Sequence, residues 1–168
     1  MNTTAELPVI VWFRKDLRLG DNHALSAACQ SGRPVLAVYI REAPESGNGP
    51  LGAAQRWWLH HSLRSLETAL ATHGCRLILR SGPADKVIDA LIAESGADSV
   101  YWNRRYDPAG IAVDTALKNK LAERGLSARS FSGQLLHEPS RLKTGGGTPY
   151  RVFTPFWRAL EGNGEPEA

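Results

Sequence analysis

Charged and hydrogen-bonding side chains follow two apolar runs of the sequence, at the point where each run ends. Arg14, Lys15 and Asp16 come directly after residues 9–13, and a second polar group follows Trp102. That second group consists of Asn103, Arg104, Arg105 and Asp107. A few polar groups set around aromatic rings are typical of a site that holds a flat molecule with a polar rim. We therefore expect a binding site with an aromatic floor made by Trp12, Phe13, Tyr101 and Trp102.

Covalent and metal chemistry have weaker support in the sequence. No convincing triad, nucleophile with an adjacent base, or metal cluster is recognisable, so we assign neither catalytic nor metal-ligating residues. His60 and His61 lack a His or carboxylate partner at helical spacing. Cys29 and Cys75 have no Cys or His neighbour at metal spacing, which is typical of small apolar side chains in a reducing compartment. The sequence therefore predicts a binding site and not a catalytic or metal site.

A glycine pattern in the loop over residues 41–52 imitates a dinucleotide fingerprint. Gly47, Gly49 and Gly52 fit G-x-G-x-x-G, but that motif requires its first Gly tight against a strand and an acidic residue after the next strand. Here six residues separate Ile40 from Gly47, and the next strand ends in Arg80. We therefore do not expect a nicotinamide cofactor.

Alternating elements must position the polar groups. Apolar runs predict strands at residues 9–13, 35–40, 77–79 and 98–102, a weaker edge strand is predicted at 127–131, and helical spacing of apolar residues predicts a helix after each of the first four. The first helix is expected to begin near Asn22 with Asp21 as its cap. This alternation predicts a three-layer, doubly wound, five-stranded parallel sheet, Rossmann-like or flavodoxin-like, in the order 3-2-1-4-5.

Such a sheet binds ligands at the carboxyl ends of its strands, where the crossover direction reverses. The crevice should therefore open between the loops after the first and fourth strands. The residues predicted to bind the ligand are Trp12, Phe13, Arg14, Lys15, Asp16, Ile40, Arg41, Trp102, Asn103, Arg104, Arg105 and Asp107. Trp57 and Trp58 lie nearby in a long predicted helix and cannot share one direction, since helical neighbours are about 100° apart. Either one Trp faces a partner domain or planar ligand, or it rests on the preceding loop.

The chain is expected to contain one complete domain. We predict a disordered tail at residues 1–8, the Rossmann-like domain at 9–133, and a differently patterned segment at 134–168. That last segment carries Phe153, Phe156 and Trp157 without an obvious core of its own. These three aromatic side chains are predicted to be the first contacts of a further domain.

Composition favours a soluble protein of the cytoplasm. Of the 168 residues, 42% are hydrophobic and 22% charged, which is ordinary for a globular protein. No apolar run reaches the roughly 20 residues that cross a bilayer, and the N-terminus does not resemble an export signal. The net charge of +3 and pI near 9.1 permit contact with nucleic acid without requiring it, and we expect no direct DNA binding by this segment.

Four segments resemble one family in the same order and at similar spacing. They are Trp-Phe-Arg-Lys-Asp-Leu-Arg-Leu-Gly-Asp-Asn (12–22), Val-Tyr-Trp-Asn (100–103), Leu-Leu-His-Glu-Pro (135–139) and Gly-Thr-Pro-Tyr-Arg-Val-Phe-Thr-Pro-Phe-Trp (147–157). Together they resemble the DNA photolyase and cryptochrome family. The resemblance covers nearly the whole chain and is greatest to the N-terminal antenna domain of a bacterial deoxyribodipyrimidine photolyase, followed by the connector to a C-terminal FAD domain.

This resemblance implies a function for the longer protein. Such a protein would bind reduced FAD in its C-terminal domain and repair cyclobutane pyrimidine dimers in UV-damaged DNA by blue-light-driven electron transfer. The present residues would hold a second, light-harvesting chromophore that passes its excitation to the flavin. Their partners would be the FAD domain and, through the longer protein, damaged DNA. The 168 residues alone are expected to be inactive in repair.

The identity of the chromophore stays open between methenyltetrahydrofolate, a deazaflavin and a flavin nucleotide. Folate-binding relatives often carry a carboxylate shortly after the Asp-Pro turn, where this chain has Ala109-Gly110, and a His in the loop at 41–52, which has none. Deazaflavin-binding relatives often have an acidic residue where Arg105 stands. An empty pocket is the remaining possibility.

Two other functions compete with this one. A cryptochrome-type photoreceptor shares the same motifs. A stand-alone nucleotide-binding α/β module, of the universal-stress or electron-transfer-flavoprotein kind, would use the same fold without a further domain.

Overall fold

The computed structural model describes residues 6–42, 51–135 and 137–164. Gly47, Gly49 and most of the predicted tail lie outside the described residues, as does Leu136 of the third family motif. Among the described residues, five strands and four α-helices alternate up to Phe131, and a fifth α-helix lies near the C-terminus. The strands are β1 (Val9–Phe13), β2 (Val35–Arg41), β3 (Leu77–Ser81), β4 (Ser99–Asn103) and β5 (Ser127–Phe131). The helices are α1 (His23–Gln30), α2 (Ala53–Ala71), α3 (Ala84–Ser95), α4 (Pro108–Glu123) and α5 (Phe153–Gly162), with a 3-10 helix at Pro139–Arg141.

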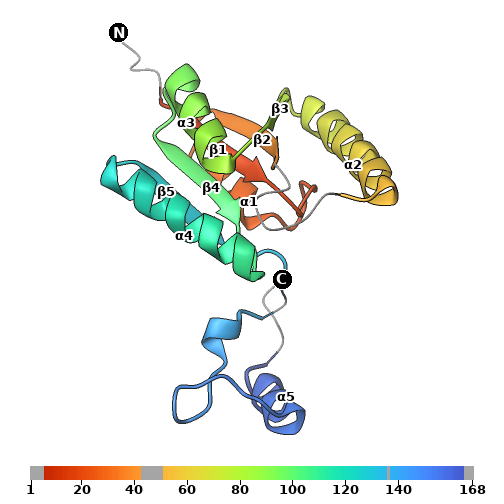
Figure 1. The fold of residues 1–168 in the computed structure, drawn as a ribbon, viewed down its shortest axis with the longest axis vertical. Helices are drawn as coiled ribbons and strands as arrows, with labels where there is room; N and C mark the ends of the chain where they lie inside the picture. The colour runs from red at the N-terminus through yellow and green to blue at the C-terminus, as the bar shows by residue number, and fades with distance from the viewer. Residues whose placement is uncertain (1–5, 43–50, 136, 165–168) are drawn as a thin grey trace. The chain divides into compact units, whose positions relative to one another are not determined.

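All five strands are parallel and stand in the order β3-β2-β1-β4-β5, which confirms the predicted fold and strand order (Figure 1). β1 is central, with Val9 beside Val35 of β2 on one side and Ser99 of β4 on the other. Every residue of β1 and β4 is buried, as a parallel sheet covered on both faces requires. The crossover direction reverses at β1, so the loops after β1 and β4 emerge side by side.

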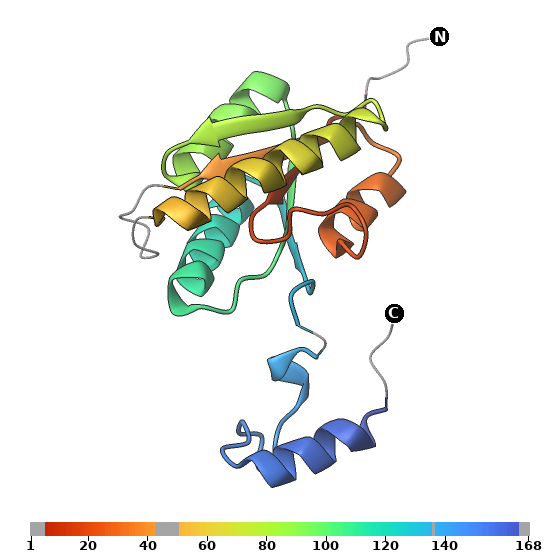
Figure 2. The ribbon, with the colours of Figure 1, turned by 90° about the vertical axis from the view of Figure 1, so that its right-hand side faces the viewer.

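Helices cover both faces of the sheet, and each face has its own core (Figures 1 and 2). Side chains from α3 and α4 pack on one face, where Trp12 and Trp102 are buried. Side chains from α1 and α2 pack on the other, where Phe13 and Tyr101 are buried. Neighbouring residues of a strand point to opposite faces, so the four rings are divided between two cores. They do not form the single aromatic floor that the sequence suggested.

Local capping fixes the two helices that begin beside the polar loops. Asn22 caps α1, with its side-chain oxygen accepting from Leu25 N–H at 3.1 Å, so the prediction of Asp21 as the cap was wrong by one residue. Asp21 instead has a φ of 49° and its carboxylate pairs with Arg18 at 2.9 Å. Asp107 caps α4 by accepting from Gly110 N–H at 2.7 Å, and Pro108 follows at the first helical position.

At the amino ends of the strands, Arg33 joins the segments that precede β1 and β4. Its Nε donates to Leu7 O at 2.6 Å and its Nη2 to Pro8 O at 3.3 Å, and the same side chain pairs with Asp98. The described end of the predicted tail is thus tied to the start of β4. Residues 1–5 lie outside the described ranges.

The chain divides into two compact units, one ending at Gly133 and the other beginning at Gln134. In the second unit, Phe153 and Trp157 of α5 stack with ring centres 5.9 Å apart, and Phe153 remains 71% exposed. Phe156 packs edge-on against Tyr150. Within the described ranges, no helix is long and apolar enough to cross a membrane, and no group of three or more His, Cys, Asp or Glu is placed to hold a metal ion.

Candidate functional site

A cavity of about 610 Å³ opens at the carboxyl ends of β1 and β2, beside the start of α2. Its size is within the range of small-molecule sites. Charged side chains from three loops share its wall with apolar and aromatic ones. The lining residues are Arg14, Lys15, Leu17, Arg18, Tyr39, Ile40, Arg41, Glu42, Leu51, Gln55, Trp58, Leu59, Ser62 and Arg105.

Five of the twelve residues predicted to bind a ligand line this cavity: Arg14, Lys15, Ile40, Arg41 and Arg105. The other seven do not line it, and most of them support those that do. These seven are Trp12, Phe13, Asp16, Trp102, Asn103, Arg104 and Asp107. The opening lies on the β2 side of β1, whereas the sequence placed its centre between the loops after β1 and β4.

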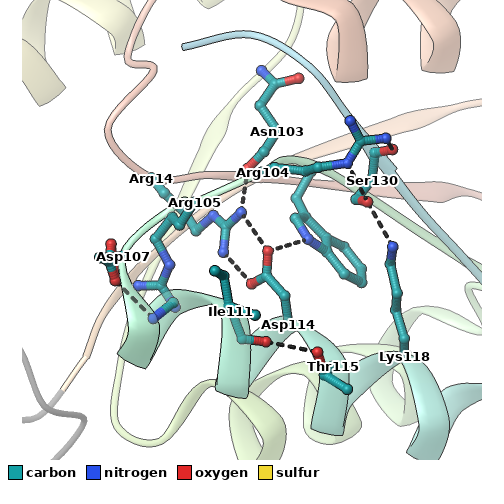
Figure 3. A network of polar contacts seen from close by, with 12 residues as sticks. Arg14, Asn103, Arg104, Arg105, Asp107, Ile111, Asp114, Thr115, Lys118 and Ser130 are labelled. Carbon is teal, nitrogen blue, oxygen red and sulfur yellow. Dashed lines mark hydrogen bonds and ion pairs between the residues drawn. The ribbon is translucent and has the colours of Figure 1, made fainter. Parts of the chain in front are cut away.

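Arg14 is held from below by Asp114 of α4 (Figure 3). Its Nη1 lies 2.5 Å from Asp114 Oδ1, its Nη2 donates to the other carboxylate oxygen at 3.1 Å, and Nη2 also donates to Asn103 O. Trp102 Nε1 donates to the same carboxylate at 2.9 Å. The guanidinium therefore has one fixed direction, with its centre 4.6 Å from the Trp12 ring centre. Asp114 is a supporting residue that the sequence analysis missed, although an acid on the apolar stripe of α4 was a usable signal.

Asp16 and Asn103 join the loops after β1 and β4. Asp16 accepts from Arg14 N–H at 2.7 Å and from Asn103 Nδ2 at 2.6 Å. Asn103 Nδ2 also donates to Asn22 Oδ1 at 2.9 Å, and its Oδ1 accepts from Ala24 N–H at 3.1 Å. These side chains are almost completely buried, at 1–3% exposure. Their role is to fix the loops rather than to contact a ligand.

Arg105 pairs with Glu42, the residue directly after β2. Arg105 Nη1 lies 2.5 Å from Glu42 Oε2, and the two side chains are only 3% and 15% exposed. The Arg105 side chain runs over Gly110, where an added Cβ would lie 2.5 Å from Arg105 Cβ. Glycine is therefore needed at this position for the guanidinium to reach Glu42. The sequence analysis missed Glu42, whose partner is 63 residues away in the chain.

Several side-chain nitrogen and oxygen atoms of the residues that line the cavity have no hydrogen-bond partner among the described residues. Arg14 Nε, Glu42 Oε1 and both Nε and Nη2 of Arg105 are buried without a partner among the described residues, as is Trp12 Nε1 below them. Buried polar groups in folded proteins are normally satisfied by protein, water or ligand. Three cavity-lining side chains, Arg14, Glu42 and Arg105, thus keep buried polar atoms that no described residue satisfies.

The rim of the cavity carries an ion pair between Lys15 and Asp107, 3.5 Å apart. Burial tends to raise the pKa of Asp107, but the Gly110 N–H and the charges of Lys15 and Arg105 outweigh burial, so the pKa lies below its ordinary value. Burial, followed by the charge of Glu42, raises the pKa of Tyr39 on the opposite wall. Asp107 is thus anionic and Tyr39 neutral at physiological pH.

The two adjacent tryptophans of α2 have different surroundings. Trp58 lines the cavity and is 70% exposed, while Trp57 is 62% exposed and packs on His61 with ring centres 4.4 Å apart. Trp58 is therefore the ring available to a planar ligand.

Arg104 lies on the far side of β4, where its Nη2 donates to Ser130 O at 2.9 Å. Lys118 donates to Ser130 Oγ there, and burial together with the Arg104 charge lowers the pKa of Lys118 (Figure 3).

Comparison with known proteins identifies the family. The DNA photolyase family model matches residues 9–168. The chain is 65% identical over 161 residues to a deoxyribodipyrimidine photo-lyase of Agrobacterium fabrum and 37% identical over 161 residues to cryptochrome-1 of Arabidopsis thaliana, covering 96% and 95% of this chain but 33% and 24% of those proteins. The crystal structure of a bacterial class III photolyase from Agrobacterium tumefaciens superimposes with a TM-score of 0.89 at 64% identity over 97% of this chain and 33% of that one. The chain thus spans about a third of the length of its photolyase relatives. This chain belongs to the DNA photolyase family, and its five-stranded unit corresponds to the N-terminal part of those proteins.

Proposed function

We propose that residues 9–133 form the light-harvesting domain of a deoxyribodipyrimidine photolyase and hold a planar chromophore in the cavity beside β1 and β2. The observation that carries this proposal is the composition of the cavity wall. A flat, accessible ring at Trp58 stands with the buried Arg14, Glu42 and Arg105, which retain unused hydrogen-bonding atoms. Energy transfer requires a fixed orientation of the pigment, and these rigidly held side chains suit that requirement better than they suit acid–base or nucleophilic chemistry.

The wall fits the heterocycles of folate and flavin pigments in kind. A pterin or isoalloxazine edge presents N–H donors next to carbonyl acceptors, which match the Glu42 carboxylate and the Arg105 guanidinium respectively. Glu42, directly after β2, places a carboxylate beside Arg105, the position at which deazaflavin-binding relatives often have an acid. Methenyltetrahydrofolate, a deazaflavin and a flavin nucleotide all remain candidates. When bound, the chromophore would absorb near-ultraviolet or blue light and pass the excitation on.

The longer protein, in this proposal, carries FAD in a C-terminal domain and repairs cyclobutane pyrimidine dimers in DNA. The 65% identity to a bacterial photolyase, against 37% to a plant cryptochrome, supports repair over a photoreceptor role. Phe153 and Trp157, exposed on α5, and Phe156 are proposed to contact that FAD domain. The free thiols Cys29 and Cys75 support a cytoplasmic location. DNA would be bound by the longer protein and not by this segment.

Pigment binding can be tested on the 168 residues. Methenyltetrahydrofolate, 8-hydroxydeazaflavin and FMN are titrated separately, and binding is read from the shift of the pigment's absorption band and from induced circular dichroism. Trp58→Ala and Glu42→Gln are expected to weaken binding at least tenfold, because each removes a contact of the kind that fixes orientation. Trp57→Ala is the matched control, since Trp57 is similarly exposed on the same helix but does not line the cavity.

The result that would refute this site is clear. If none of the three pigments binds, or if Trp57→Ala is as damaging as Trp58→Ala, the cavity is not the chromophore site. Tight binding of AMP or ATP, with no pigment binding, would instead support a stand-alone nucleotide-binding module.

Repair is tested on the longer protein. We expect it to split cyclobutane dimers under blue light, and we expect the 168 residues alone not to. A longer protein that binds flavin yet leaves dimers intact would favour the photoreceptor. Repair by the 168 residues alone would overturn the assignment of the chemistry to a further domain.

A further inference from the structure

Two lysines of α4, Lys118 and Lys120, have opposite surroundings although they are close together in the helix. Lys120 Nζ lies 2.5 Å from Asp89 and 3.3 Å from Asp85, so two carboxylates balance its charge. Lys118 makes no ion pair in the part of the chain that the structure describes, and it is half-buried beside β5 (Figure 3). It lies outside the proposed chromophore cavity.

A chain of hydrogen bonds favours the neutral amine at Lys118. Arg104 Nε lies 3.2 Å from Ser130 Oγ, and Lys118 Nζ lies 2.6 Å from the same oxygen. An ammonium group could only donate to that oxygen, as the guanidinium does, and the hydroxyl proton of Ser130 would then need another acceptor. With a neutral amine, Arg104 donates to Ser130 and Ser130 donates to Lys118, so every group in the chain is matched.

The charges around Lys118 act mainly in the same direction. Burial, followed by the charge of Arg104, lowers the pKa of Lys118, whereas the charge of Asp114 raises it. Asp114 is already paired with the buried Arg14, which weakens its attraction for a proton at Lys118. The remaining neighbour is the uncharged ring of Trp102, whose centre lies 5.9 Å from Lys118 Nζ.

A neutral amine beside a guanidinium suits reaction with carbon dioxide. The nitrogen lone pair attacks the carbon atom, a C–N bond forms, one C–O π bond breaks, and a proton leaves the nitrogen for solvent. The product is a carbamate, whose negative charge replaces the positive charge of an ammonium group. The repulsion between Lys118 and Arg104 then becomes an attraction, and the Ser130 hydroxyl can donate to a charged acceptor.

We propose that Lys118 is a site of reversible modification by carbon dioxide, at which Arg104 and Ser130 stabilise the carbamate. The modification reverses a charge at the contact between α4 and β5, next to Trp102. Trp102 donates to Asp114, which supports the wall of the chromophore cavity. Carbon dioxide would therefore act on the surroundings of that support. The proposal does not depend on which pigment the cavity holds.

The test traps carbamates on the 168 residues. The protein is equilibrated with isotopically labelled bicarbonate, ethylated with triethyloxonium tetrafluoroborate, digested, and analysed by peptide mass spectrometry. Lys118 is expected to carry at least about tenfold more label than Lys120, whose pKa is raised chiefly by its hydrogen bond to Asp89, because each pKa unit between two amines changes their neutral fractions about tenfold. Removal of carbon dioxide with nitrogen before trapping should erase the label. This comparison needs no substitution.

Three variants test the stabilising groups. Arg104→Gln should lower labelling of Lys118 about tenfold, because it removes a charge that disfavours the ammonium and favours the carbamate. Ser130→Ala removes a hydrogen-bond donor to the carbamate and should lower labelling about fivefold. Asp89→Asn is the matched control, which should raise labelling of Lys120 and leave that of Lys118 unchanged. Circular dichroism confirms that each variant is folded.

Three results would each overturn the proposal. They are equal labelling of Lys118 and Lys120, a label on Lys118 that survives removal of carbon dioxide, and labelling of Lys118 that is the same in Arg104→Gln and Ser130→Ala as in the unaltered chain.

Discussion

Removal of the Asp114 carboxylate tests how the cavity is held together. In Asp114→Ala, Arg14 would keep a guanidinium that is only 4% exposed but lose its counter-charge, and Trp102 Nε1 would lose its acceptor. Breaking a buried ion pair from one side costs about 3–5 kcal/mol. Asp114→Asn keeps one amide oxygen as an acceptor, so its cost should be nearer 2 kcal/mol, the penalty of an incompletely satisfied buried group.

The control for this prediction is Asp89→Ala. Asp89 forms two ion pairs, with Lys120 at 2.5 Å and Arg124 at 2.7 Å, but on the surface between α3 and α4. Exposed pairs contribute roughly 0–1 kcal/mol. Urea unfolding of the 168 residues, followed by far-UV circular dichroism, gives all three free energies of unfolding. If Asp114→Ala is no more destabilising than Asp89→Ala, then Arg14 is not held by Asp114 and our description of the cavity wall fails.

Three further predictions use the same unfolding assay. Gly110→Ala should cost about 1–3 kcal/mol, because the new Cβ would lie 2.5 Å from Arg105 Cβ and 2.7 Å from Asp107 Oδ2, whereas Gly145→Ala, with nothing within 4 Å, should change little. Leu70→Ala should cost about 2–5 kcal/mol and Leu79→Ala less than about 1 kcal/mol, since Leu70 is 3% exposed and Leu79 is 53% exposed; similar costs would contradict the packing of α2. Acid should destabilise the fold below about pH 4, because hydrogen bonds from Ser99 and Arg33 lower the pKa of Asp98, and stability from a lowered carboxyl pKa is present above the unfolded value and is lost as pH falls through the folded one. Asp98→Asn should flatten that loss, and an unchanged acid transition would contradict it.

The strand order was predictable because β1, β2 and β4 contain continuous apolar runs, and a β–α alternation leaves few arrangements for the sheet. The predicted aromatic floor of the binding site, in contrast, was wrong. Trp12 and Phe13 are adjacent, and a strand sends neighbours to opposite faces, so rings that are close in sequence belong to different cores. Charged residues in the loops were recognised as a group, but the sequence did not indicate which of them would be buried as supports.

The partners of the site residues were the least predictable feature. Asp114 lies 100 residues from Arg14, and Glu42 lies 63 residues from Arg105. Spacing rules describe neighbours within one helix or strand, and neither pair is of that kind. The observed cavity lies nearer to β2 than the predicted one for the same reason. Glu42 and Trp58 line it from segments that the sequence analysis had treated as a loop and a helix face.

The position of β1 has a consequence for the synthesis of this protein. The central strand is made first, yet Val9 must wait for Ser99, 90 residues later, before its second neighbour exists. At ribosomal rates of about 5–20 residues per second, that interval is roughly 5–20 s. During it, five consecutive apolar residues that are 0–1% exposed in the finished fold have one open flank. A stall in translation before residue 99 is therefore expected to promote aggregation.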